Sequence, residues 1–239
     1  IELNAFLENL ESVSAVLSHI RVVDKHGTIR YGKGISGAEP GFLRDFDFFQ
    51  KILHNPEAEL VISGPLISPI SHDWTMIFAR RLRAPDGSFA GAVYASMPTT
   101  QFQSLLSSVA LGPHGAATLR TAQLELIHRT PDTKNAVGSR EVSAQLQQAV
   151  NNRPEGGGYI AKTAIDGIER SNAYRKVAGY PLYVIVGLAT QDYLGNWQEN
   201  MLIIAGLAAL AILVSAIAAY RNYLAQSKLS ATIAELTQL

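Results

Sequence analysis

The sequence contains no cysteine in its 239 residues. This absence excludes a disulfide framework and any site built on thiolates. An exported domain without thiols cannot form wrong disulfides, so the composition agrees with a location outside the cytoplasm. The chain also lacks an excess of either charge, because 20 Lys and Arg balance 20 Asp and Glu. A nucleic-acid partner requires a positive surface, so this balance disfavours DNA and RNA.

Signals of a catalytic or metal centre are lacking as well. The six histidines show no metal-ligand spacing, and no serine or carboxylate pair stands in a recognisable catalytic motif. His72 and Asp73 are adjacent, and we interpret them as part of a solvated loop. Residues 32–37 have the glycine spacing of a dinucleotide site, but residues 39–41 interrupt the chain and no parallel strand–helix–strand unit follows. We therefore expect no catalytic residue, no metal and no cofactor, and we interpret the glycine-rich loop as a cover over a pocket.

A long apolar run dominates what the sequence does contain. Residues 201–220 carry no charge over the length that a helix needs to cross the hydrocarbon core of a bilayer. We interpret the run as a transmembrane helix in contact with lipid; burial in a soluble domain is the alternative. Arg221 and Lys228 follow it, and no acidic residue occurs before Glu235. The positive-inside rule then predicts a cytoplasmic C-terminus, with residues 1–200 on the periplasmic side of a bacterial inner membrane.

The sequence pattern is helical at both ends, up to the first and the last residue. We expect a longer protein, with an earlier membrane helix before Ile1 and a cytoplasmic part after Leu239. Apolar residues after the membrane run recur at the spacing of a coiled-coil seam, although any amphipathic helix has such positions. These residues are Leu224, Leu229, Ile233 and Leu236.

The first two hundred residues repeat one order of elements: a hairpin, a helix and a three-stranded meander. An amphipathic helix over 6–20 leads into the first hairpin, whose turn requires the conformational freedom of Gly27. Antiparallel strands with helices to one side are typical of an α+β architecture. The predicted elements after the first hairpin are a helix over 45–53, strands over 59–66, 73–82 and 88–97, a linking helix over 99–111, a hairpin over 116–130, a helix over 139–152 and strands over 157–164, 168–177 and 181–189.

These elements resemble the double Cache sensor domain, two stacked PAS-like modules on a long N-terminal helix between two membrane spans of bacterial receptors. The resemblance rests on VVDKHGTIRY in the first hairpin, DFDFFQ at 45–50, Trp74 with Arg80, GSFAGAVYASM, HRTPD at 128–132 and RSNAYRKVAGYPLYVIVGL at 170–188. It implies a stalk helix over 1–19, a membrane-distal module over 20–98, a linking helix over 99–112, a membrane-proximal module over 113–196, a transmembrane helix over 197–222 and a cytoplasmic signalling helix over 223–239.

One position departs from the family pattern. Such domains often read Asp-Arg-Asp-Tyr-Phe, and this chain has Phe46 in place of the arginine. A ligand carboxylate bound by that arginine is therefore not assumed here.

The candidate ligand site lies in the distal module, which by the resemblance is the usual ligand holder, whereas the proximal module is more often a connector. The period of two places Trp74, Met76, Phe78 and Arg80 on one face of a strand. Aromatic walls with one fixed cation suit a small anionic or zwitterionic molecule. In the alternative interpretation the apolar residues are core, and Arg80 reaches solvent or pairs with a nearby aspartate. The candidate ligand-binding residues are Asp47, Phe48, Trp74, Phe78, Arg80, Tyr94 and Ser96.

The resemblance implies a ligand-sensing and transmembrane signalling region that works as a parallel homodimer. A ligand that prefers one arrangement of the outer dimer would bias the membrane helices. No HAMP relay is recognisable after the membrane run, which favours a diguanylate cyclase that makes cyclic di-GMP as the cytoplasmic output. A sensor histidine kinase or a chemoreceptor is the alternative, and a non-enzymatic membrane binding protein is a more distant one.

Overall fold

A computed structural model of the chain describes residues 2–14, 16–35, 41–68, 71–132 and 136–236, without the side chains of 195–196, 198–199 and 224–236. Part of the glycine-rich loop (36–40) and the predicted coiled-coil side chains therefore lie outside the described residues. The chain divides into two units, Ile1–Thr190 and Gln191–Leu239. The first unit contains two antiparallel sheets with helices, so the predicted α+β fold with two modules is confirmed.

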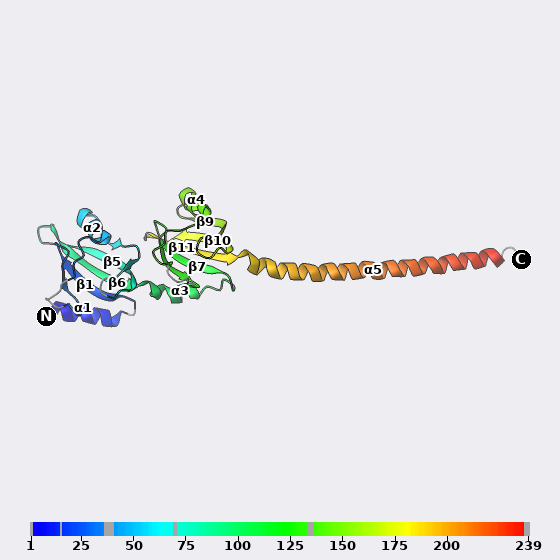
Figure 1. Cartoon of the computed structure of the whole chain (residues 1–239), viewed down its shortest axis with the longest axis horizontal. Helices are drawn as coiled ribbons and strands as arrows, with labels where there is room; N and C mark the ends of the chain where they lie inside the picture. The colour runs from blue at the N-terminus through cyan, green and yellow to red at the C-terminus, as the bar shows by residue number, and fades with distance from the viewer. Residues whose placement is uncertain (1, 15, 36–40, 69–70, 133–135, 237–239) are drawn as a thin grey trace. The chain divides into compact units, whose positions relative to one another are not determined.

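The first sheet has six strands in the order β2-β1-β6-β5-β3, with β4 also paired to β5 (Figure 1). The hairpin turn between the first two strands forms as predicted, because Gly27 adopts a φ of +89° and its N–H donates to the Asp24 carbonyl. The strands are β1 (Ser18–Asp24), β2 (Ile29–Tyr31), β3 (Val61–Ile62), β4 (Leu66–Ile67), β5 (Trp74–Arg83) and β6 (Phe89–Pro98).

Helix α2 (Asp47–His54) supplies the core on one face of this sheet. Its side chains Phe48, Phe49 and Ile52 are almost completely buried against Ile77, Ala79 and other apolar residues of the strands. Spacings of three and four residues place such side chains on one helical face, which explains why this short amphipathic segment folds as a helix against the sheet.

Helix α1 (Glu2–Val13) is shorter than the predicted stalk, because the chain pairs as β1 from Ser18 onwards. Leu7 buries its side chain, and Glu11 accepts a hydrogen bond from the backbone N–H of Ile20 and forms a 2.8 Å ion pair with buried Arg21. These contacts fix the helix to β1.

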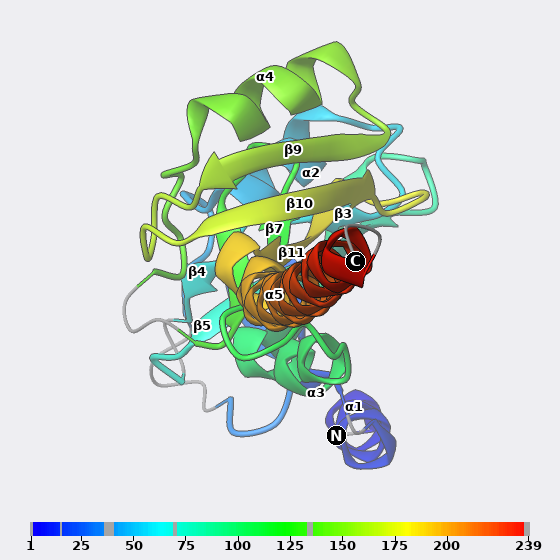
Figure 2. The same ribbon diagram turned by 90° about the vertical axis from the view of Figure 1, so that its right-hand side faces the viewer.

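The second sheet repeats the architecture with five strands in the order β8-β7-β11-β10-β9. Helix α4 lies along β9 (Figure 2) and buries Leu146 and Val150 against the tyrosines of the sheet. The predicted linking helix is a 3₁₀ turn, η1 (Thr99–Phe102), followed by α3 (Gln103–Ser107). The remaining elements are β7 (Ala116–Thr121), β8 (Leu126–Thr130), α4 (Ala144–Asn152), β9 (Gly156–Lys162), β10 (Glu169–Lys176) and β11 (Leu182–Ala189).

Strand β5 is buried on both faces over its first half. Ile77 and Ala79 belong to the core under α2, whereas Met76 belongs to a second cluster with Leu106 of α3 and Ala117 of β7. This second cluster joins residues of both modules.

The second unit is helical. Helix α5 (Thr190–Leu236) has 47 residues and contains one segment, Asn200–Tyr223, that is long and apolar enough to cross a membrane. The side chains of the segment Asn200–Tyr223 are exposed.

Candidate ligand-binding sites

A cavity of about 320 Å³, including its opening to solvent, lies in the distal module between α2 and the sheet. Its walls are mainly aromatic and aliphatic, and Phe46 stands where the family resemblance has an arginine. The lining residues are His19, Leu43, Phe46, Phe48, Leu66, Ser68, Ile77, Tyr94 and Ser96.

Few polar side chains line this distal cavity, namely those of His19, Ser68, Tyr94 and Ser96. Burial raises the pKa of Tyr94 well above its ordinary value, outweighing the nearby charge of Arg21, so the phenol stays protonated. The Ser96 hydroxyl donates to the Ser18 carbonyl at 2.8 Å and lies 3.4 Å from Nδ1 of His19. Among the described residues that line the cavity there is no Lys, Arg, Asp or Glu. An apolar body with a compact polar end suits such walls.

Three of the seven predicted site residues, Phe48, Tyr94 and Ser96, line this cavity, and the other four do not. The side chains alternate along β5 as predicted, but Trp74, Phe78 and Arg80 do not border this cavity. Ile77, on the opposite face, borders the cavity. Because both faces of the strand are buried near its start, the alternation alone does not tell which face meets the ligand.

The four remaining residues have other surroundings. Trp74 lies close to Gly138 of the proximal module, where an added Cβ would come within 2.8 Å of the indole ring. Phe78 packs against the cluster that joins the two modules. Arg80 is exposed, and Asp47 forms an exposed ion pair with Lys51 one turn along α2.

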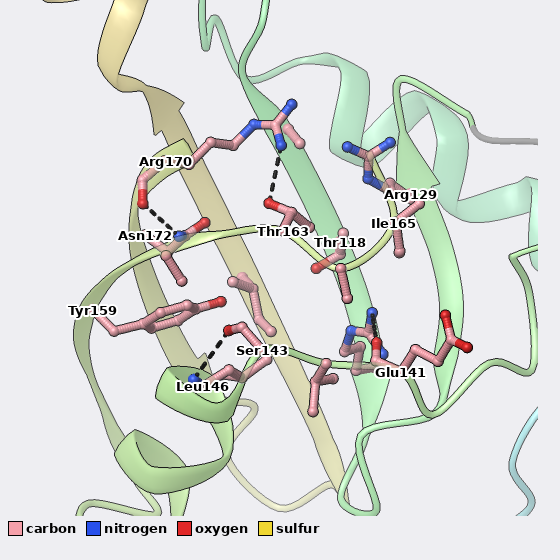
Figure 3. A pocket seen from close by; sticks show the side chains of 16 residues that line it. Thr118, Arg129, Glu141, Ser143, Leu146, Tyr159, Thr163, Ile165, Arg170 and Asn172 are labelled. Carbon is pink, nitrogen blue, oxygen red and sulfur yellow. Dashed lines mark hydrogen bonds between the residues drawn. The ribbon is translucent and has the colours of Figure 1, made fainter. Parts of the chain in front are cut away.

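A second cavity, of about 460 Å³ including its opening, lies in the proximal module between the sheet and α4 (Figure 3). Three arginines line it, and each exposes 3% or less of its surface. The lining residues are Ala116, Thr118, Arg120, Arg129, Glu141, Val142, Ser143, Leu146, Tyr159, Ala161, Thr163, Ala164, Ile165, Arg170, Asn172 and Ile185.

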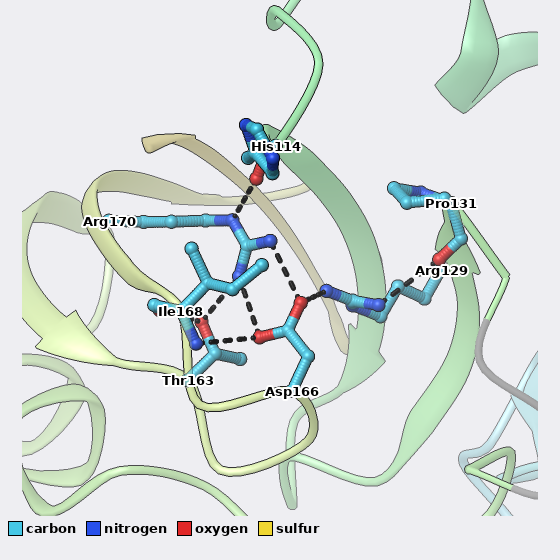
Figure 4. Close-up of polar contacts among 7 residues, drawn as sticks. All are labelled: His114, Arg129, Pro131, Thr163, Asp166, Ile168 and Arg170. Carbon is cyan, nitrogen blue, oxygen red and sulfur yellow. Dashed lines mark hydrogen bonds and ion pairs between the residues drawn. The ribbon is translucent and has the colours of Figure 1, made fainter. Parts of the chain in front are cut away.

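Two of these arginines share one carboxylate (Figure 4). Arg170 binds both oxygens of Asp166, and Arg129 donates to Oδ2 of the same group. Partial burial raises the pKa of Asp166, but the hydrogen bonds from Arg170 and from the Ile168 N–H, with the charges of both arginines, lower it to about 2. Arg170 also donates to the His114 carbonyl at 2.8 Å. The carboxylate therefore stays ionised and holds two guanidinium groups in place.

Arg120 is bound differently. Its guanidinium donates to the backbone carbonyls of Leu124, Ser139 and Glu141, and it forms no ion pair with a described residue. Burial lowers the pKa of Arg120 to about 10; Tyr159 opposes this effect and the charge of Arg129 adds to it. The group is still a cation at neutral pH.

None of the three buried arginines was among the sequence-based candidates. Arg170 lies inside a segment that supported the family resemblance, and Arg120 occupies a strand of otherwise small or apolar residues, AATLRT. A charged residue within a fully buried strand is the signal that could have identified this site, because such a group must meet a partner or a ligand.

Comparisons with known proteins agree with this architecture. Residues 99–187 match a family model, dCache_1_like, described as a histidine kinase sensor domain. The fold is similar to the extracellular domain of rpHK1S-Z16, described as a histidine kinase, with a TM-score of 0.69 and 28% identity over 82% of this chain and 78% of that one. This is a double Cache-like sensor fold.

Two further solved structures share the double Cache-like fold at lower identity. The extracellular domain of mmHK1S-Z2, also described as a histidine kinase, matches with a TM-score of 0.61 and 14% identity over 81% of this chain and 82% of that one. The ligand-binding domain of Campylobacter jejuni chemoreceptor Tlp3, in complex with 4-methylisoleucine, matches with a TM-score of 0.51 and 12% identity over 79% of this chain and 69% of that one. No curated protein matches the sequence.

Proposed function

We propose that this chain is the extracellular ligand-sensing region of a membrane-anchored histidine kinase. The similarity to the extracellular domain of rpHK1S-Z16 over most of both chains carries this proposal, together with the family match over 99–187. The apolar segment Asn200–Tyr223 has the length to anchor the sensor in an inner membrane, with the C-terminus in the cytoplasm and the chain paired as a parallel homodimer.

A chemoreceptor output fits the fold as well, since Tlp3 shares it. The diguanylate cyclase that the missing HAMP relay suggested is not supported by these matches, although one uninterrupted helix, α5, does follow the sensor. The full-length gene product tests the output directly. A histidine kinase transfers phosphate from ATP to its own histidine, whereas cyclic di-GMP made from GTP would instead restore the cyclase interpretation.

In the distal cavity we place a small ligand with an aliphatic body and a compact polar end. The apolar walls favour this class, and the solved complexes of Tlp3 contain L-valine, L-norvaline, isoleucine and 4-methylisoleucine. The fixed cation expected from Arg80 is absent from the described residues of the lining, so, of the anionic or zwitterionic molecules expected from the sequence, a purely anionic one is disfavoured. His19, Ser68, Tyr94 and Ser96 are the groups available to bind the polar end.

The test is a thermal-unfolding screen of the whole chain in nanodiscs made of an uncharged phospholipid. Aliphatic amino acids are compared with their amides and their deaminated acids, because these analogues separate the contributions of the two charged groups. A bound ligand raises the unfolding midpoint in a saturable manner.

Variants connect the response to the cavity. Tyr94→Phe removes only a hydroxyl and is expected to weaken the response. Arg80→Ala is expected to preserve the response, because Arg80 lies on the face of β5 opposite to Ile77, which borders the cavity. If no compound of this class stabilises the protein, or if Tyr94→Phe and Phe48→Leu respond like the unmodified chain, the distal site is disproved.

A further inference from the structure

The cavity of the proximal module has an excess of buried positive charge. Three arginines line it, while Glu141, the one acidic side chain among the described residues of the lining, is exposed. Asp166 compensates Arg129 and Arg170 from the turn between β9 and β10. One partly buried carboxylate is therefore shared by two of the three arginines.

Arg120 is the cation that this carboxylate does not reach. Its three acceptors are neutral backbone carbonyls, at distances up to 3.4 Å, and no described acidic residue forms an ion pair with it. A buried charge without a counter-charge is costly, because the desolvation penalty is offset only by pairing.

The other walls supply hydrogen-bond donors. Burial raises the pKa of Tyr159 to about 12, so its hydroxyl stays protonated and can donate. Thr118 adds a hydroxyl to the lining, whereas the Thr163 hydroxyl already donates to the Ile168 carbonyl and accepts from Arg170. The first turn of α4 also borders the cavity, with Ser143 as its N-cap, and the N-terminus of a helix favours negative charge.

From this arrangement we propose that the proximal module carries a second ligand site, which binds a small anion through carboxylate or phosphate oxygens with Arg120 as its principal counter-charge. The narrow space beside the small side chains of Ala116 and Ala161 favours a compact anion, such as phosphate, sulfate or acetate. The site is separate from the distal cavity and different in chemistry, so it gives the sensor a second input.

The test is a binding titration of the whole chain in nanodiscs of uncharged phospholipid. Phosphate, sulfate, acetate, propionate and succinate are compared with chloride at constant ionic strength, by calorimetry and by the shift in unfolding midpoint. Saturable binding of at least one oxyanion is expected, and the phosphate and carboxylate arms distinguish the two sources of the shared chemistry.

Arg120→Gln is expected to weaken that binding at least about tenfold, because it removes a charge-assisted contact. Arg175→Gln is the matched control: this arginine is exposed on β10 of the same module, outside the lining, and its loss is expected to leave the affinity unchanged. Circular dichroism reports whether each variant is folded.

A second pair of variants avoids the buried core. Ala164 is exposed and borders the cavity, so Ala164→Glu adds a repelling charge at its rim while Ala164→Gln adds only bulk. The glutamate is expected to weaken anion binding and the glutamine to preserve most of it. Absence of saturable oxyanion binding, or an affinity in Arg120→Gln and Ala164→Glu equal to that of the unmodified chain, would overturn the proposal. The response to aliphatic amino acids in these variants reports on the distal site separately.

Discussion

Arg170 and Asp166 form a two-point ion pair, with Nη1 donating to Oδ1 at 2.9 Å and Nη2 to Oδ2 at 2.8 Å. The parallel geometry fixes the plane of the guanidinium, and the aspartate orients Arg129 at the same time. One carboxylate thus organises a whole side of the proximal cavity.

Asp166→Asn is expected to destabilise the sensor by about 3 kcal/mol, because it leaves two buried arginines without their shared counter-charge. Urea unfolding measures this loss. Glu155→Gln is the control, since its ion pair with Lys176 is on the surface and such pairs contribute about 0–1 kcal/mol. Equal effects of the two substitutions would contradict the central role of Asp166.

Acid stability depends on the same carboxylate. The pKa of Asp166 is about 2 in the folded chain and 3.8 ordinarily, so folding favours the ionised form. The resulting stabilisation, about 2 kcal/mol, is fully present above pH 3.8 and is lost as the pH falls towards 2. Unfolding measured at several pH values should therefore show a steep loss in this window. Asp166→Asn should show a smaller loss, and parallel curves would refute the assignment.

His128 is expected to cause a second pH dependence of stability, at a higher pH than that of Asp166. Burial lowers the pKa of His128 below 6.5, outweighing the charge of Asp132, and its Nε2 has no hydrogen-bond partner among the described residues. His128 therefore binds a proton more readily in the unfolded chain than in the folded chain. As a result, the free energy of unfolding falls as the pH drops below 6.5. One proton limits this slope to about 1.4 kcal/mol per pH unit. His128→Gln should reduce the slope, and an unchanged slope would show that His128 is not its source.

Gly32→Ala is expected to destabilise the distal module by about 2 kcal/mol or more, because Gly32 has a φ of +139° and an added Cβ would overlap Cδ of Arg21. Gly34→Ala is the matched control: its φ is +74°, but no atom lies within 4 Å of the added Cβ. That variant has backbone strain alone, about 1 kcal/mol. Thermal unfolding compares the two, and a Gly34 variant as unstable as the Gly32 variant would exclude the contact with Arg21 as the cause.

The order of elements could be predicted from the sequence because its signals are local. The turn at Gly27 and the periodicity of the strands in the second module gave the two sheets, and the apolar run gave the candidate membrane helix. The helix over 45–53 also matches α2 to within two residues.

The sites could not be predicted to the same extent, because they depend on which buried face meets which neighbour. Alternation along β5 correctly separated Trp74 and Phe78 from Ile77, but tertiary packing placed the first two towards the proximal module. Likewise, the sequence gives no sign that Arg120 and Arg129, on paired strands, share a cavity with Arg170 from a distant strand. Such a cluster exists only after the sheet has formed.

Strand pairing places Arg170 directly opposite Ala189, the last residue of β11, and Thr190 begins α5 with no residue between. Arg170, which lines the cavity, is therefore paired in the sheet with the residue that directly precedes the helix containing the apolar segment. Strand β10 is hydrogen-bonded to a neighbour on both sides. A displacement of Arg170 would therefore strain its pairing with Ala189, the residue directly before α5. Of the two modules, the proximal one therefore has the shorter covalent path to the apolar segment of α5.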